Sequence, residues 1–442
     1  MKPPRTVHRF LCLGLAGLLL CGCLAGCGKE PPSESRIDSQ PVSEEESVVP
    51  DPTSTPVPHV SSESPANSQS SPGTTKKADR TTDTTAVRPT TTTTTAAVPE
   101  PVHTPTPATA KDALSNTLYK LTVEKKLTVG YLGGSVTYGT GASNESTKSW
   151  RALTTQWLKN TYPDAAVTEA NAAIGGTGSL HGACRLQNDL LKPSNPDLIF
   201  VEFAINDGYQ GYLQDQSERY MESLIRMARE YNAKADIVLV YVTTKGQKKQ
   251  NTDAIYAFNT VATRYHIPVI DVGKKLYSRV QNADSCFKDG VHPNDSGHAY
   301  YAAYVQEFLK TYMTGGKSLQ SHTIPKASRS DLLMNPTYYS AASISQANPD
   351  IGVLRGDALE IAVGETVHVA FKGKTLVMCW QTTHRGTVYT QLDSESRHRL
   401  INGNQDGTQR ILFEGLSSGS HNLAIQAKGT DPMFIQRVYA FQ

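Results

Sequence analysis

The 442-residue chain is predicted to hold an α/β domain, a three-layer doubly wound parallel sheet of flavodoxin-like type, followed by an all-β sandwich of jelly-roll type. Two observations predict this: apolar runs alternate with amphipathic stretches over residues 112–315, and strand-like runs separated by polar turns fill residues 316–442. A third observation concerns the segment before these two domains: residues 1–27 resemble an export signal, and residues 28–111 are rich in Ser, Thr and Pro.

The first residues have the features of an export signal. Basic residues precede an apolar run over residues 10–20, which is too short to cross a bilayer comfortably. The run leads to a Leu-Ala-Gly-Cys sequence ending at Cys27, which resembles a bacterial lipobox, in which the cysteine is acylated after cleavage. The alternative is an ordinary secretory signal. We expect a lipidated Cys27 that holds the exported protein on the outer face of the cell membrane.

The segment 28–111 contains almost no large apolar residues. Such a composition cannot bury enough surface to offset the chain entropy lost on folding. We expect a disordered, partly extended linker that carries the folded part away from the membrane.

Composition also limits the partners and the cysteine chemistry. The formal net charge is only +2 without a basic cluster, which argues against nucleic-acid binding. Beyond the signal the cysteines are Cys184, Cys286 and Cys379, too widely spaced for a disulfide framework or a metal site. We expect buried thiols, although Cys184 and Cys286 could pair if the fold brought them together.

The α/β domain is predicted from alternating strand and helix patterns. The apolar runs expected to form its strands are 127–132, 166–170, 198–203, 237–242 and 269–272, and the helical candidates are 150–160, 216–231, 253–265 and 295–312. In such a sheet the ligand site lies at the carboxyl ends of the strands.

The sandwich is predicted from short strands that recur roughly every eight to twelve residues. After about residue 315 no helix is expected, and the strand candidates are 358–363, 366–371, 375–380, 387–392, 409–413, 422–427 and 433–441.

Polar or glycine-rich segments follow several predicted strands. They are Gly133-Gly134-Ser135, Asn171 to Gly176, Ala204 to Asp207, and Asp289-Gly290-Val291-His292-Pro293. Because parallel strands end at one edge of the sheet, these segments are expected to meet there. The serine hydroxyl is a poor nucleophile unless a neutral imidazole takes its proton, as His292 would, and Asp289 is placed to orient that imidazole.

In this order, the segments resemble the Ser, Gly, Asn and His blocks of SGNH/GDSL hydrolases over roughly residues 127–312. The resemblance implies a serine esterase without metal or cofactor, with Ser135 as nucleophile. It assigns the oxyanion donors to the backbone N–H groups of Ser135 and Gly176 and to the side-chain amide of Asn206. Gly175 is the alternative to Gly176, which the family block favours.

Two positions depart from the family pattern. The usual Gly-Asp-Ser is Gly-Gly-Ser here, so the carboxylate before the nucleophile is missing at Gly134. That leaves the mechanism intact and puts the support of the Ser135 loop in doubt. The third block has Ala204 where Gly is common, and it keeps the amide.

Other interpretations of the same residues are weaker. Ser135 and Asn206 could be turn residues, and Asp289 could cap the helix that begins near Asp295. Asp289 and His292, with His298, could be imagined as metal ligands, while His298 alone is expected to be an ordinary helix-face residue. The glycines after residue 175 miss the dinucleotide-binding spacing.

The expected substrate follows from the accessory domain. The sandwich is similar to the jelly-roll domain of some carbohydrate esterases, and Trp380 or Tyr389 could stack on a sugar, although strand aromatics more often lie in a core. We expect hydrolysis of short acyl groups, above all acetyl, from polysaccharide. The alternatives are a lipase, thioesterase or acyltransferase of the same fold, and a catalytically silent glycan-binding surface protein.

Overall fold

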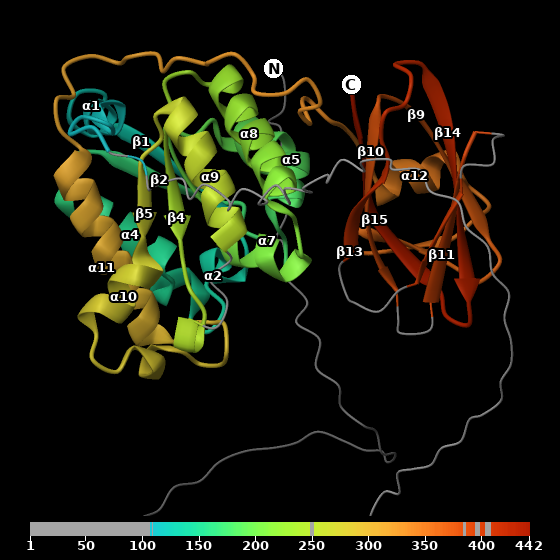
Figure 1. Ribbon diagram of the computed structural model, residues 1–442, viewed down its shortest axis with the longest axis horizontal. Helices are drawn as coiled ribbons and strands as arrows, with labels where there is room; N and C mark the ends of the chain where they lie inside the picture. Colours follow the sequence, from blue (N-terminus) through green and yellow to red (C-terminus); the bar gives the residue numbers. More distant parts are fainter. Residues whose placement is uncertain (1–106, 108, 248–251, 383–385, 394–397, 403–407) are drawn as a thin grey trace, which may run out of the picture. The chain divides into compact units, whose positions relative to one another are not determined.

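The computed structural model describes residues 107, 109–247, 252–382, 386–393, 398–402 and 408–442 (Figure 1). The expected export signal with Cys27, and nearly all of the expected linker 28–111, lie outside the described residues. None of the helices in these ranges has the length and apolar character that a membrane crossing requires.

The first domain is built on a parallel five-stranded sheet in the order β2-β1-β3-β4-β5, the flavodoxin-like order. Its strands are β1 (Lys126–Gly133), β2 (Ala166–Asn171), β3 (Leu198–Glu202), β4 (Asp236–Tyr241) and β5 (Val269–Asp271). Each expected strand is present within one or two residues of its predicted bounds. The α/β prediction is therefore confirmed.

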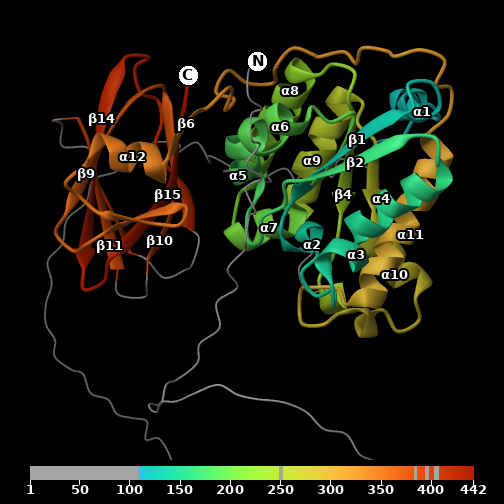
Figure 2. The same cartoon turned by 180° about the vertical axis from the view of Figure 1, so that it is seen from behind.

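Helices cover both faces of this sheet, as Figures 1 and 2 show. The strands alternate between two cores, so that Leu198 and Phe200 of β3 face one helical layer while Ile199 and Val201 face the other. On the first face lie α1 (Ser115–Thr122), α4 (Trp150–Thr161), α10 (Val272–Arg279) and α11 (Asp295–Tyr312), and on the second α5 (Ser179–Leu186), α8 (Gln214–Tyr231) and α9 (Thr252–Tyr265). Shorter elements are α2 (Ser135–Tyr138), α3 (Glu145–Lys148), the π-helix η1 (Gln187–Leu191), α6 (Lys192–Ser194), α7 (Ala204–Gln210) and the 3-10 turns η2 (Lys245–Gln247) and η3 (Ala283–Cys286).

The second domain consists of two antiparallel sheets around an apolar core. One sheet has the order β13-β10-β15-β8-β7 with β6 beside β15, and the other the order β12-β11-β14-β9. The strands are β6 (Thr337–Ser340), β7 (Val353–Arg355), β8 (Ala358–Ile361), β9 (Thr366–Lys372), β10 (Thr375–Thr382), β11 (Gly386–Leu392), β12 (His398–Asn402), β13 (Thr408–Phe413), β14 (Ser420–Gly429) and β15 (Met433–Phe441).

Several expectations for this region were incomplete or wrong. A helix, α12 (Ala341–Ala347), does follow residue 315, because Ser340 caps a short alanine-rich turn whose Ala341 and Ile344 pack into the sandwich core. Trp380 is fully buried in that core and is not a sugar platform. The expectation of buried thiols is confirmed for Cys184, Cys286 and Cys379, and Cys184 and Cys286, which lie in different apolar clusters, are not paired.

Candidate active site

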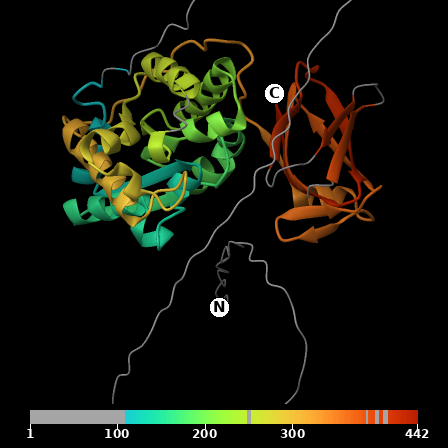
Figure 3. The same cartoon turned by 60° about the horizontal axis from the view of Figure 1, so that its bottom comes forward.

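The predicted site residues meet at the carboxyl edge of the parallel sheet. Ser135 begins α2 directly after β1, Asn206 lies in α7 after β3, and His292 lies in the loop before α11. Figure 3 brings forward the lower end of Figure 1, where α2 lies. Together with Gly176, these residues line one cavity.

A serine, a histidine and an aspartate form a continuous hydrogen-bonded chain. His292 Nε2 lies 2.9 Å from Ser135 Oγ, and His292 Nδ1 lies 2.9 Å from Asp289 Oδ2. A carboxylate only accepts hydrogen bonds, so Nδ1 carries the hydrogen and Nε2 of the neutral ring is left to accept from the serine hydroxyl. This tautomer is the one that general-base chemistry at Ser135 needs.

Solvent exposure of half of its side chain, 51%, and the loop conformation both favour the ionised form of Asp289. Oδ1 accepts the backbone N–H groups of Val291 at 2.7 Å and His292 at 2.8 Å. Partial burial would raise the pKa of Asp289, but these bonds and the one from the imidazole outweigh it and lower the pKa to about 2. The helix cap that Asp289 might have supplied comes instead from Asn294, whose Oδ1 accepts from Gly297 N–H at 3.1 Å.

Two glycines shape the space beside the nucleophile. Gly176 has a φ of 73°, in the left-handed region that favours glycine, and a Cβ there would meet no atom within 4 Å. A Cβ on Gly134 would lie 2.1 Å from Asn206 Oδ1, so the Asn206 amide would have to shift to admit a side chain there. Glycine at position 134, where the family usually has a carboxylate, thus allows the Asn206 amide to approach the Ser135 turn closely.

The loop holding Gly176 is tied to the helix holding Asn206. Asp207 accepts from Ser179 N–H at 2.7 Å and Ser179 Oγ at 2.6 Å, and Gln210 Nε2 donates to the Gly176 carbonyl at 3.0 Å. Burial raises the pKa of Asp207 to about 7, against the opposing effect of the Ser179 bonds. The sequence shows the Asn-Asp pair but does not reveal a role for Asp207, because its partner Ser179 lies on another element.

His298 lies in helix α11, as expected, and is in addition fully buried. Its Nδ1 lies 3.3 Å from Trp150 N and its Nε2 lies 3.2 Å from the Thr140 carbonyl oxygen. The N–H of Trp150 therefore donates to Nδ1, while Nε2–H donates to Thr140. With both ring nitrogens engaged in hydrogen bonds, His298 has no free lone pair to bind a metal. This argues against the alternative in which Asp289, His292 and His298 are metal ligands.

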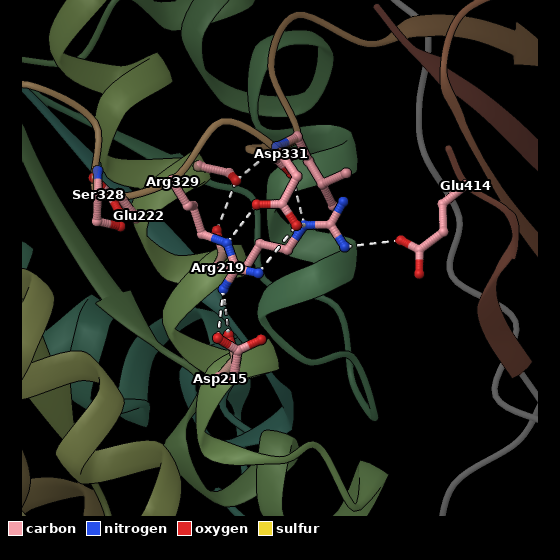
Figure 4. A network of polar contacts seen from close by, with 9 residues as sticks. Asp215, Arg219, Glu222, Ser328, Arg329, Asp331 and Glu414 are labelled. Carbon is pink, nitrogen blue, oxygen red and sulfur yellow. Dashed lines mark hydrogen bonds and ion pairs between the residues drawn. The ribbon is translucent and has the colours of Figure 1, made fainter. Parts of the chain in front are cut away.

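The cavity around Ser135 has a volume of about 1680 Å³. A charged network forms part of its wall (Figure 4), in which Arg219 Nη1 lies 2.9 Å from Glu414 Oε2 and Arg329 Nη1 lies 2.7 Å from Asp215 Oδ1. Asp331 contacts both arginines. The polar lining also includes Gln210, Gln216, Gln409 and Arg410.

A second serine, histidine and aspartate lie close together in the sandwich. His421 Nδ1 lies 3.0 Å from Asp393 Oδ2, and His421 Nε2 lies 3.3 Å from Ser417 Oγ and 3.1 Å from the Ser417 carbonyl oxygen. The same Nε2 faces the Ser417 carbonyl oxygen, which only accepts hydrogen bonds, so this group lacks the arrangement seen at Ser135, where Nε2 faces the hydroxyl alone. The contacts among Ser417, His421 and Asp393 stabilise the local loop structure of the sandwich.

Comparison with known proteins agrees with the geometry at the sheet edge. Residues 131–300 match the GDSL-like Lipase/Acylhydrolase family. Thioesterase 1/protease 1/lysophospholipase L1 of Escherichia coli (strain K12) is 24% identical over 181 residues, 40% of this chain and 81% of that protein. The arylesterase of Vibrio mimicus is 24% identical over 164 residues, 37% of this chain and 80% of that protein.

The two-domain arrangement also has a solved counterpart. The crystal structure of a two-domain esterase (CEX) active on acetylated mannans superposes with a TM-score of 0.64 at 19% identity, covering 76% of this chain and 96% of that chain. At this identity the likeness concerns the fold. The chain thus carries a domain of the GDSL-like lipase/acylhydrolase (SGNH) family and is a hydrolase of ester bonds.

Proposed function

We propose that this protein is an exported, lipid-anchored serine esterase that removes short acyl groups, above all acetyl, from carbohydrate through an acyl-enzyme on Ser135. The observation that carries the proposal is the chain of hydrogen bonds from Asp289 through His292 to Ser135, which lies beside a large cavity lined by both polar and apolar side chains.

In the first half-reaction Ser135 Oγ attacks the acyl carbonyl carbon while His292 Nε2 takes the hydroxyl proton. The carbonyl electron pair moves to its oxygen, and the N–H groups of Ser135 and Gly176 and the amide of Asn206 donate to it. Collapse of this intermediate breaks the bond to the sugar oxygen, which receives the proton from the imidazolium.

The second half-reaction releases the acid. Nε2 of His292 takes a proton from water as the water oxygen attacks the acyl carbon of the ester on Ser135. Collapse expels Ser135 Oγ, which regains its proton from the ring. Asp289 stays ionised throughout and stabilises the imidazolium in each half-reaction.

The walls of the cavity favour a polar substrate. Burying a long acyl chain yields about 0.8 kcal/mol per CH₂ only where apolar walls receive it. Here apolar side chains share the lining with amide and charged ones, among them Gln216, Arg219 and Gln409, which suit the hydroxyl groups of a sugar. The activity of the structurally similar two-domain esterase on acetylated mannans supports the same substrate class.

The test is acetate release from acetylated mannan and acetylated xylan by the purified protein and by Ser135→Ala. We expect turnover by the parent chain and loss of at least about 10³-fold in the variant. Nitrophenyl palmitate and an acyl-thioester serve as competing substrates. Preference for either of these over the acetylated glycans would contradict the carbohydrate assignment and favour a lipase or thioesterase.

The proposed membrane anchor has its own experiment. Cells that express the full chain are grown with a radioactive fatty acid, and we expect label on the protein that Cys27→Ser abolishes. An unlabelled parent protein with the same secretion would refute the anchor and leave the esterase proposal intact.

A further inference from the structure

A buried glutamate lies directly beneath the nucleophile loop. Glu202 is the last residue of β3, and its partner in the register with β1 is Gly133, two residues before Ser135. Its side chain is 1% exposed, and Oε2 accepts a hydrogen bond from Thr137 Oγ1 at 2.8 Å. Thr137 is itself fully buried in α2, the one-turn helix that Ser135 begins.

The groups that donate hydrogen bonds to this carboxyl belong to the nucleophile loop. Burial raises the pKa of Glu202 to about 8, and the hydroxyl of Thr137 with the backbone N–H groups of Gly134 and Thr137 acts in the opposite direction. Oε1 is buried and has no hydrogen-bond partner of ordinary geometry among the described residues. Glu202 therefore interacts with both ends of the turn that presents Ser135.

Side chains on the other side pack closely against the two glycines of this turn. A Cβ on Gly134 would lie 2.1 Å from Asn206 Oδ1, and a Cβ on Gly133 would lie 2.5 Å from Thr137 Oγ1. An acidic side chain before the nucleophile thus conflicts with the position of Asn206. The carboxyl that does contact this turn comes from β3, through Glu202.

We propose that Glu202 and Thr137 together position Ser135. They are positioning residues, since neither lines the cavity. Their hydrogen bond fixes α2 against β3 and so holds Ser135 Oγ within reach of His292 Nε2. The inference rests on Ser135 as the nucleophile and not on carbohydrate as the substrate.

The test compares two threonines in matched surroundings. Thr137→Val removes the hydroxyl that donates to Glu202 and keeps the side-chain shape. The control is Thr117→Val, because Thr117 Oγ1 donates at 2.7 Å to Asp236, a buried carboxyl at the start of β4, at the opposite edge of the sheet. Both variants lose one buried hydrogen bond to a carboxyl.

With nitrophenyl acetate, we expect kcat of Thr137→Val to fall by at least about tenfold with KM within twofold, because a small misplacement of reacting groups is costly. The rate of Ser135 modification by a fluorophosphonate should fall in parallel. Thr117→Val should lose a similar amount of Tm and keep kcat within twofold. Thr137→Ser restores the hydroxyl and should regain most of the lost kcat.

A Thr137→Val protein with unchanged kcat and unchanged fluorophosphonate rate would overturn the proposal. If that variant does not fold, Glu202→Asp replaces it, since the carboxyl is kept but withdrawn from Thr137. The same fall in kcat is expected for Glu202→Asp, and an unchanged kcat in this variant would also overturn the proposal. Ser135→Ala distinguishes failure of the nucleophile assignment from failure of the positioning role. If Ser135→Ala keeps full turnover, the nucleophile assignment fails. If Ser135→Ala is inactive and Thr137→Val is fully active, only the positioning role is refuted.

Discussion

At the scale of single residues, the site depends on groups whose charge and shape are set by their immediate neighbours. Asp289 keeps a low pKa through backbone N–H groups of its own loop, so its role follows from three adjacent positions and was predictable from the Asp-Gly-Val-His sequence. Glu202 and Asp207 were not predictable in the same way. Their partners, Thr137 and Ser179, lie far along the chain, and no local pattern relates them.

Asp289→Asn tests the charge at this position. The amide can donate to Nδ1 and so favour the tautomer in which Nε2 carries the hydrogen, which cannot take the proton of Ser135. We expect kcat on nitrophenyl acetate to fall about 10²- to 10⁴-fold with little change in KM. The control is Asp295→Asn, which removes a nearby exposed carboxylate bonded to Lys148 and should leave kcat within twofold. Equal effects of the two variants would contradict the orienting role.

Gly134→Asp restores the common family residue and is expected to be harmful. Its Cβ would overlap Asn206 Oδ1, so either the Ser135 turn or the amide must move. Such overpacking typically costs about 1–3 kcal/mol of stability, and we expect kcat to fall as well. Gly290→Ala is the steric control, because a Cβ there meets no atom within 4 Å. An active, equally stable Gly134→Asp would show that the close approach is not a constraint.

At the scale of helices and strands, periodicity predicted the long elements well and the short ones poorly. α11 was predicted with its observed bounds because its apolar pattern extends over several turns. α5 escaped prediction, since it follows glycines and is held by Asp207. α12 escaped because two turns carry too little pattern to outweigh the surrounding strands. Packing partners, which lie elsewhere in the chain, determine such short elements.

His298, in the first turn of α11, links that helix to α4 and to the loop after α2. Burial lowers its pKa to about 4, whereas the unfolded chain has an ordinary histidine. As pH falls from about 6.5 towards 4, the unfolded state therefore binds a proton that the folded state does not, and stability decreases.

His298→Gln can keep both hydrogen bonds and does not titrate. We expect the parent chain to lose on the order of 3 kcal/mol more stability than this variant between pH 7 and pH 4, at about 1.36 kcal/mol per pKa unit. Urea unfolding at pH 7, 5.5 and 4 measures the difference. If the free energy of unfolding falls equally with decreasing pH in the two proteins, His298 is not held neutral in the folded state.

At the scale of the whole described chain, β10 and β15 are buried on both faces. Leu376 and Met378 of β10 point into the sandwich core, while Val377 and Cys379 join an apolar cluster with Leu180, Cys184 and Tyr220 of the α/β domain. Tyr439 and Phe441 of β15 belong to the same cluster. Both domains were expected from the sequence, but this shared cluster was not, because a strand pattern does not say what covers its second face.

Val377→Asp tests the shared cluster. Burial raises the pKa of Cys184 well above its usual value and that of Cys379 to about 12, so in the folded parent neither thiol should react with iodoacetamide at pH 8. An unpaired carboxylate at residue 377 should open the cluster and allow labelling of both cysteines, as read by mass spectrometry. Val353→Asp on the exposed face of β7 is the control and should leave them protected. Rapid labelling of the folded parent would contradict their burial.

The double burial of β10 and β15 also limits how this protein can be taken apart. A fragment that ended near residue 315 would leave Leu180 and Tyr220 without the side chains that now shield them from water. Such a fragment should be prone to self-association, and truncation would confuse loss of solubility with loss of substrate recognition. Point changes within the intact polypeptide are therefore the sounder way to ask what the sandwich contributes to turnover.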